Sequence, residues 1–231
     1  MNFLFESIKA AAFLILNLDS ELTGIVFLSL QISIISCIIA SIVGIPLAFL
    51  ISMNNFKLKR LFITILNSLL ALPTVVIGLF VYAFLNRRGI LGSLDLLYTW
   101  TAVVIGQTIL IIPLITSYTI SVISRLDVRY KRTAMTLGAN RLQTSQVILR
   151  EAKFGIMSVI AAAFGRVVSE IGISMMLGGN IKMFTRTMTT AMALEYDKGE
   201  FVLAVALGLI LMTISLLVNF AINWFQGKSP E

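Results

Sequence analysis

Two oppositely charged residues stand inside an apolar run in the last third of the chain. Arg166 and Glu170 are four residues apart, so a helix would place both on one face. A charge in the middle of a bilayer costs about 2.5–3.5 kcal/mol on insertion scales, so such a residue normally faces protein or water and has a partner. The pair predicts either a structural contact that fixes helix packing or the polar lining of a solute path, and the two interpretations are compatible. The predicted path residues are Arg166, Ser169, Glu170 and Ser174.

The rest of the chain offers little for covalent or metal chemistry. It contains no histidine and a single cysteine, Cys37, so we expect neither an intrachain disulfide nor a zinc site. It also lacks the G-x-x-x-x-G-K-[ST] pattern of P-loop nucleotide binding. A membrane-embedded enzyme would need a cluster of nucleophile, base or metal ligands, and the carboxylates are scattered. We therefore predict a chain that is not an enzyme and has no cofactor.

A stripe of small residues follows the apolar run around the charged pair, at steps of three and four residues. Small residues at this spacing let two membrane helices approach closely. An ordinary tightly packed helix would carry the same stripe, so the stripe alone does not indicate a solute path. Besides Ser169, it consists of the predicted helix-packing residues Ser158, Ala162, Gly165 and Gly172.

A polar segment, 178–200, comes next and begins with a Gly178-Gly179-Asn180 turn. Its hydroxyls and cations could attract an oxyanion at the outer mouth of a path. The acidic residues close by argue against that, and we favour a plain solvated loop. The polar residues concerned are Lys182, Thr185, Arg186, Thr187, Thr189 and Thr190, and the acidic ones are Glu195, Asp197 and Glu200.

The composition is that of a polytopic membrane protein. Of 231 residues, 58% are hydrophobic and 13% charged, whereas a soluble domain is nearer half apolar and about a quarter charged. The mean hydropathy is +0.97. The apolar residues form blocks long enough to cross a bilayer, which takes about 20 residues. We predict a single all-α transmembrane domain over 1–231 with an interfacial N-terminal helix at 3–18, for which a sixth span is the alternative. The five predicted spans are 22–52, 61–85, 98–123, 154–177 and 201–225.

The distribution of basic residues predicts the orientation in the membrane. One side would hold the segments 53–60, 124–153 and the C-terminal tail, with eleven Lys and Arg; the other would hold 86–97 and 178–200, with five. Cytoplasmic loops carry the excess of positive charge, so we place 125–153 and the C-terminus in the cytoplasm of a cell-membrane protein. The net charge of +7 reflects these loops, and with no RNA-binding or helix-turn-helix pattern we expect no nucleic-acid partner.

The segment 125–153 is a basic elbow between two spans. Residues 129–137 contain no Gly or Pro, so a short helix is allowed. Gly138 can adopt the left-handed conformation that ends such a helix. Asn140 and Gln143 have the spacing of a capping box that starts a second helix. The elbow is either a solvated loop or a docking site for a soluble partner.

The elbow resembles the cytoplasmic loop of ATP-binding-cassette (ABC) importer permeases, whose core motif is EAA, three residues, then G. Ala134 matches the second alanine and Gly138 the glycine, and Val147 and Leu149 match apolar positions further on. The chain departs from the general motif at three positions. The departures resemble the tungstate-importer branch of this family. Two later stretches do so as well: Glu151-Ala-Lys-Phe-Gly155 and GRVVSEIGISMMLGGNI at 165–181. The departing residues are Arg132 for the glutamate, Thr133 for the first alanine and Arg150 for a later proline.

The resemblance implies a type I ABC-importer permease fold. Two copies would form the path, with ATPase subunits on the cytoplasmic side and an extracytoplasmic oxyanion-binding protein outside. The solute would be tungstate, or molybdate, and it would be transported by alternating access. An ion-coupled or passive transporter without an ATPase is the alternative. The ATPase-coupling residues that the resemblance implies are Arg132, Thr133, Ala134, Leu137, Gly138, Ala139 and Asn140.

Overall fold

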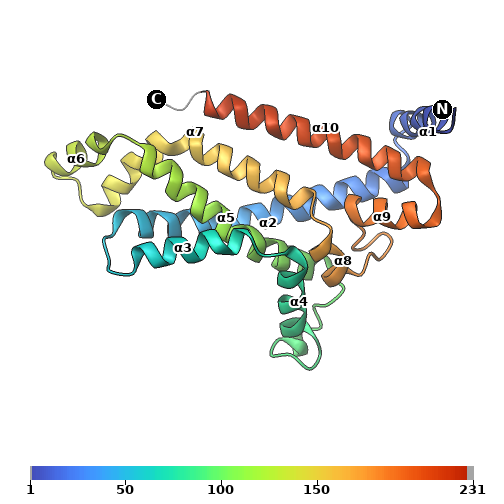
Figure 1. Cartoon of the computed structure of the whole chain (residues 1–231), viewed down its shortest axis with the longest axis horizontal. Helices are drawn as coiled ribbons and strands as arrows, with labels where there is room; N and C mark the ends of the chain where they lie inside the picture. The colour runs from blue at the N-terminus through green and yellow to red at the C-terminus, as the bar shows by residue number, and fades with distance from the viewer. Residues whose placement is uncertain (1, 228–231) are drawn as a thin grey trace. The chain divides into compact units, whose positions relative to one another are not determined.

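The computed structural model describes residues 2–227, apart from the side chains of residues 2–5 and 141. All regular elements among these residues are helices (Figure 1). The elements are α1 (Asn2–Leu16), α2 (Ser20–Met53), α3 (Lys59–Leu70), α4 (Thr74–Leu85), the short 3-10 helix η1 (Gly92–Leu94), α5 (Trp100–Arg125), α6 (Val128–Thr136), α7 (Arg141–Val168), α8 (Gly172–Gly178), α9 (Met188–Lys198) and α10 (Phe201–Gln226).

Three of the described helices, α2, α5 and α10, are each long and apolar enough to cross a membrane. Two further pairs, α3 with α4 and α7 with α8, meet this condition together but are bent where they join, so the described residues provide up to five spans. The predicted all-α, polytopic fold is therefore confirmed. The second and fourth predicted spans are not single straight helices. α1 has 15 residues, fewer than a span needs, and its placement at the membrane surface stays a prediction.

The break in the second span follows from Pro73. Proline has no N–H to donate and disfavours helical backbone at the residue before it. α3 ends at Leu70, and Pro73 precedes α4 with extended backbone, φ −60° and ψ 132°. Pro46 and Pro113, by contrast, lie inside α2 and α5 without ending them.

The chain forms two compact units, and α2, α5, α7 and α10 contribute residues to both. Unit 1 comprises Met1–Ser36, Pro73–Leu110 and Phe164–Leu217. Its main core joins α1, α2, the end of α7, α9 and α10, and a smaller cluster joins α2 to α5. The buried residues of the main core are Ala11, Leu22, Ile25, Val168, Met188, Ala191, Ala206 and Leu207; those of the smaller one are Ile32, Val103 and Val104. α8 packs against α4 in this unit.

Unit 2 comprises Cys37–Leu72, Ile111–Ala163 and Val218–Glu231. Its helices approach closely at small residues. A Cβ at Gly44 of α2 would lie 3.0 Å from Ile115 of α5, and one at Gly155 of α7 would lie 2.6 Å from Val122 of α5. α7 runs through Gly155 without interruption. As a result, the second helix of the predicted elbow and the first part of the fourth span form one continuous helix.

Candidate functional site

The predicted charged pair lies where the fourth span is interrupted, in unit 1. α7 ends at Val168, α8 begins at Gly172, and the two helices are bent by 59°. Arg166 belongs to the last turn of α7, and its Nη1 is 2.7 Å from Oε2 of Glu170 in the break. The predicted pairing is confirmed. The prediction that both residues lie on the face of one uninterrupted helix is wrong, because the helix stops between them.

Glu170 also closes the start of α8. Its Oε1 accepts hydrogen bonds from the backbone N–H of Gly172 at 2.9 Å and of Ile173 at 3.3 Å. N–H groups in the first turn of a helix have no partner within that helix. The Glu170 side chain is 3% exposed and that of Arg166 is 41% exposed. A cation on one oxygen and two N–H groups on the other therefore compensate for burying this carboxylate.

The end of α7 is held by an amide side chain from α5. The break frees carbonyl groups that would otherwise accept bonds from the next turn. Val167 O accepts from the Glu170 N–H at 3.1 Å and from Nε2 of Gln107 at 3.4 Å. Gln107 is 2% exposed, and its Oε1 accepts from Oγ of Ser36 in α2 at 3.1 Å. Gln107 is not among the predicted site residues, and its one signal in the sequence is an amide inside the apolar run 98–123.

The carbonyl of Glu170 is held by α9. Oγ1 of Thr189 donates to it at 2.8 Å, and Oγ of Ser174 lies 3.3 Å away. Ser174 is fully buried, whereas Ser169 is exposed and donates to the carbonyl of Gly165 at 2.9 Å. The four predicted path residues therefore gather at one break. Arg166 and Ser169 are accessible there, and Glu170 and Ser174 are enclosed.

The predicted stripe of small residues does not follow one helix, because α7 ends before it is complete. Its two ends still make close contacts. Ser158 donates to the carbonyl of Ile222 in α10 at 3.3 Å. A Cβ at Gly172 would lie 3.1 Å from Oγ1 of Thr74 in α4. Ala162 and Gly165, between them, are half-buried.

The polar segment 178–200 is not a solvated loop, so that prediction is wrong. Much of it forms α9, and three of its threonines are at most 5% exposed: Thr185, Thr187 and Thr190. The hydroxyls of Thr187 and Thr190 form a capping box at the start of α9. They serve the backbone here, which explains why a threonine-rich segment is buried.

The cations of this segment are paired with carboxylates. Nζ of Lys182 lies 2.8 Å from Glu21 at the start of α2, and Nζ of Lys198 lies 2.9 Å from Glu195. The nearly buried Arg186 lies between these two carboxylates, at 3.6 Å from Glu21 and 3.8 Å from Glu195. This arrangement favours a structural network in unit 1 over an oxyanion site.

The basic elbow in unit 2 has the predicted local structure. Asp127 caps α6 by accepting from the Arg129 N–H at 2.8 Å. Gly138 has φ +83°, in the left-handed region. Asn140 and Gln143 form the capping box in both directions, at 2.8 and 2.9 Å. The predicted helix, glycine and second helix are therefore confirmed.

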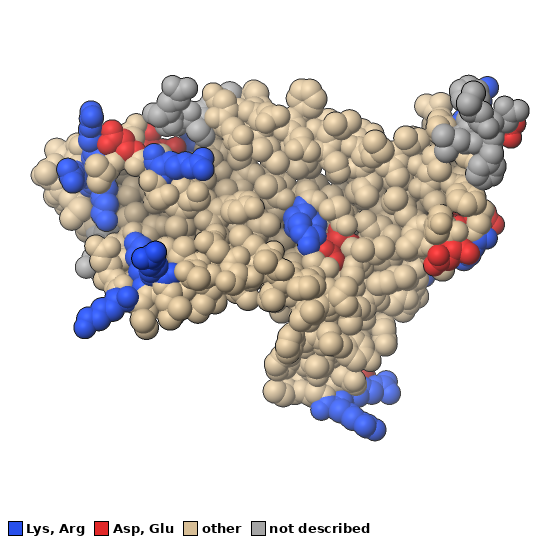
Figure 2. All heavy atoms as spheres, viewed as in Figure 1, with Lys and Arg blue, Asp and Glu red and all other residues tan. Residues whose placement is uncertain are grey.

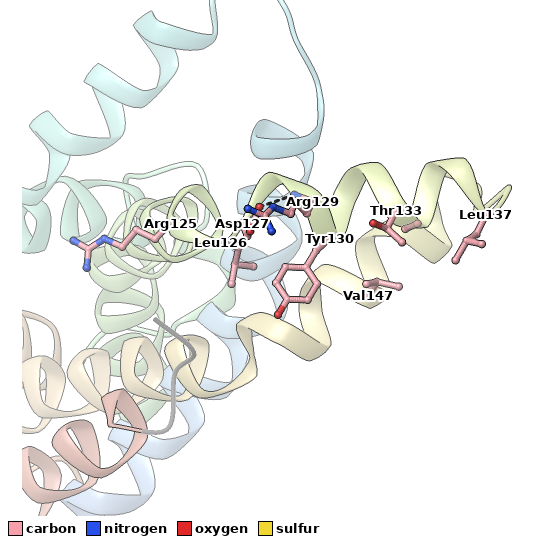
Figure 3. A pocket seen from close by; sticks show the side chains of 9 residues that line it. Arg125, Leu126, Asp127, Arg129, Tyr130, Thr133, Leu137 and Val147 are labelled. Atoms are coloured by element: carbon pink, nitrogen blue, oxygen red, sulfur yellow. Dashed lines mark hydrogen bonds and ion pairs between the residues drawn. The ribbon is translucent and has the colours of Figure 1, made fainter.

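The elbow carries a hollow of about 530 Å³ between α6, the end of α5 and the start of α7 (Figure 3). Basic side chains gather over α6 and the nearby start of α3 (Figure 2). Large apolar side chains are also exposed on the elbow: Leu137 is 82% exposed, Leu142 70% and Met135 59%. The residues lining the hollow are Arg125, Leu126, Asp127, Arg129, Tyr130, Thr133, Ala134, Leu137 and Val147.

Most of the predicted coupling residues are accessible on this elbow. Ala134 is the exception at 8% exposed, and Ala139 is half-buried. The exposed ones are Arg132, Thr133, Leu137, Gly138 and Asn140. An exposed surface that combines cations with leucines suits contact with another protein.

The sequence of this chain, with its spans and its elbow, matches a family of known proteins. Residues 40–228 match the family described as "Binding-protein-dependent transport system inner membrane component". The chain belongs to this family of ABC transporter permeases. It is accordingly a multi-pass inner-membrane protein and the non-catalytic subunit of a transporter that works with a binding protein and an ATPase.

Two relatives resemble it over nearly their whole length. The tungstate uptake system permease protein TupB of Peptoclostridium acidaminophilum is 40% identical, covering 99% of this chain and all of the relative. TupB of Campylobacter jejuni is 37% identical, covering 95% of this chain and 92% of the relative. In fold, the chain matches one in a crystal structure of the MetNI methionine ABC transporter, with a TM-score of 0.72 and 17% identity over 93% of this chain and 99% of that one.

Proposed function

We propose that this permease imports a tetrahedral oxyanion, with tungstate as the solute and molybdate as its close competitor. The observation that carries the proposal is the full-length similarity to two tungstate uptake permeases. Tungstate and molybdate are dianions of the same shape and nearly the same size. A site in the permease would therefore separate them poorly, and the binding protein would set most of the selectivity.

The solute path, in this proposal, passes the break between α7 and α8. Arg166 is the cation there, with Ser169 accessible beside it and Glu170 and Ser174 holding the backbone. A guanidinium has five N–H donors in a planar fork that suits oxyanions. Nη1 of Arg166 bonds to Glu170, so donors remain on the accessible part of the side chain for a passing anion.

The elbow would dock the ATPase. This proposal is supported by a capped turn that carries exposed apolar and basic side chains. Because the start of α7 is capped, a movement of the bound partner would be transmitted to α7 without unwinding its first turn. The residues assigned to coupling are Arg132, Thr133, Ala134, Leu137, Gly138, Ala139 and Asn140.

Several features of the assembly belong to the same proposal. Two copies of the chain, as one permease domain each, enclose the path by alternating access. The elbow at 125–153 and the C-terminus lie in the cytoplasm, and residues 3–18 lie along the membrane surface. The excess of basic residues on one side supports this orientation.

Reconstitution tests the proposal. The permease is combined with its ATPase in proteoliposomes, and ATP hydrolysis is measured with the binding protein loaded with tungstate, molybdate or sulfate. We expect tungstate and molybdate to stimulate hydrolysis together with uptake, and sulfate to do so less. Uptake that proceeds without the ATPase would favour the alternative, an ion-coupled or passive transporter. Equal stimulation by all three anions would contradict the assigned solute.

A further inference from the structure

We propose that Gln107 is a positioning residue of the transporter, which holds the break between α7 and α8 in the geometry that pairs Arg166 with Glu170. The inference rests on the proposed function in that it takes the solute path to pass this pair. Gln107 itself is 2% exposed, so it would act on the path through the backbone that it holds and not by contact with the solute.

Both ends of the Gln107 amide are engaged, each by a different helix. Oγ of Ser36 in α2 lies 3.1 Å from Oε1 and shares its one proton between Oε1 and the carbonyl of Ile32 at 2.8 Å, and Nε2 donates to the carbonyl of Val167 at 3.4 Å. Val167 directly follows Arg166 in the last turn of α7. Fixing this carbonyl therefore fixes the backbone that carries the guanidinium.

The hydrogen bond to Val167 favours the broken form of the helix. In a continuous α-helix, Val167 O would accept from the N–H of Ile171. Here it accepts from Gln107 and from the Glu170 N–H instead. The Gln107 amide thus supplies a second donor to a carbonyl that has lost its Ile171 partner, and in this proposal it stabilises the bend in that way.

The neighbouring residue of α5 contacts the other side of the break. A Cβ at Gly106 would lie 2.5 Å from Cδ1 of Leu177 and 2.6 Å from Cγ2 of Ile173, both in α8. Gly106 thus lets α8 rest on α5 while Gln107 holds the end of α7. Gly106 and Gln107, two successive residues of α5, therefore contact the two helices on either side of the bend.

A double-mutant cycle tests this role in the complete transporter, reconstituted with its ATPase and binding protein. Gln107→Met keeps the volume and removes both hydrogen bonds, and Glu170→Gln weakens the pair. We expect Gln107→Met to lower the maximal rate of tungstate uptake about threefold or more, because the variant no longer holds the carbonyl of Val167 and the backbone beside Arg166. The concentration of loaded binding protein that gives half-maximal uptake should not change. The double variant should lose less than the product of the two single losses.

The matched control is Thr108→Val, a near-isosteric change at the next residue of α5. Thr108 is also buried, and its hydroxyl has no partner among the described residues. The Thr108→Val variant should leave uptake unchanged and show no coupling to Glu170→Gln. If Thr108→Val loses as much as Gln107→Met, or if the Gln107 and Glu170 losses simply multiply, the effect is one of general packing and the positioning role is wrong.

Ser36→Ala keeps the test decisive if Gln107→Met does not assemble. It removes one bond that orients the amide, and should lower maximal uptake less than Gln107→Met does while still coupling to Glu170→Gln. Ser33→Ala, another buried serine of α2, is its control. Absence of coupling for Ser36→Ala contradicts the inference. If Arg166→Gln and Glu170→Gln leave uptake unchanged, the assigned path fails and this inference with it; if they lower uptake while Gln107→Met does not, only the role of Gln107 fails.

Discussion

α7 begins and ends at an interruption of the helical chain, and the two interruptions are built differently. At its start, Gly138 takes a left-handed conformation, a Cβ there would meet nothing within 4 Å, and the caps come from residues three apart in sequence. At its end, no residue of 169–171 has positive φ. The freed backbone groups are instead satisfied by Glu170, Gln107 and Thr189.

The difference indicates different uses. The elbow is held by its own local bonds, so it can keep its shape while its outer surface contacts a partner. The break between α7 and α8 depends on α5 and α9, so a movement of either helix changes its geometry. In the proposed function, the elbow would transmit the movement of the ATPase and the break would respond to the helices around it.

Loss of the Glu170 carboxylate should have the largest effect. Glu170→Ala removes the partner of Arg166 and both hydrogen bonds that cap the start of α8, and a hydrogen bond to a charged group contributes about 1.5–3 kcal/mol. We expect a marked fall in the thermal inactivation midpoint of the purified transporter. Glu170→Gln keeps an oxygen for the α8 caps and should cost less. Combining Glu170→Ala with Arg166→Ala should cost less than the sum of the two; strict additivity would show that the two residues do not act as partners.

Gly138→Val should have the next largest effect, confined to the elbow. A β-branched residue in left-handed backbone costs about 1–2 kcal/mol, and since the site is open, this cost is conformational and not a clash. Insertion in the membrane should persist while recovery of the ATPase falls. Gly199→Val is the matched control, because Gly199 also has positive φ with open space around it but lies after α9. Equal loss of the ATPase in both variants would remove the elbow from the docking argument.

Asn140→Ala should have a smaller effect at the same elbow. Replacing an N-cap by alanine costs about 1 kcal/mol, which frays the start of α7. Affinity for the ATPase, measured by titration of the purified permease, should weaken modestly. Asn140→Ser restores an acceptor and should recover most of it. An effect of Asn140→Ala as large as that of Gly138→Val would mean that the side chain contacts the ATPase directly.

The single-cysteine variants should keep full transport activity. Their labelling shows on which side of the membrane the elbow lies. In a Cys37→Ser background, Ser93→Cys should react with an impermeant thiol reagent from outside. Gln146→Cys should react only after the membrane is opened. Both positions are exposed, so burial does not hide them. Reaction of Gln146→Cys from outside would overturn the predicted orientation and with it the docking of an ATPase at the elbow.

The elbow and the charged pair could be predicted because their contacts are local. Gly138, the Asn140–Gln143 box and the Arg166–Glu170 spacing each involve residues within four positions, which a pattern can reveal. The spans followed from composition, since a bilayer requires long apolar blocks. These are properties of short stretches, and they do not depend on what packs against them.

The break at 169–171, the burial of the threonines of 185–190 and the role of Gln107 depend on tertiary structure. No Pro interrupts the fourth span, and its small residues suit a continuous helix equally well. Gln107 of α5 donates to the carbonyl of Val167 at the end of α7, and Thr189 of α9 donates to the carbonyl of Glu170 in the break, so the interrupted backbone keeps its hydrogen bonds. They lie 60 and 19 residues from the groups they bond, and only folding brings them together.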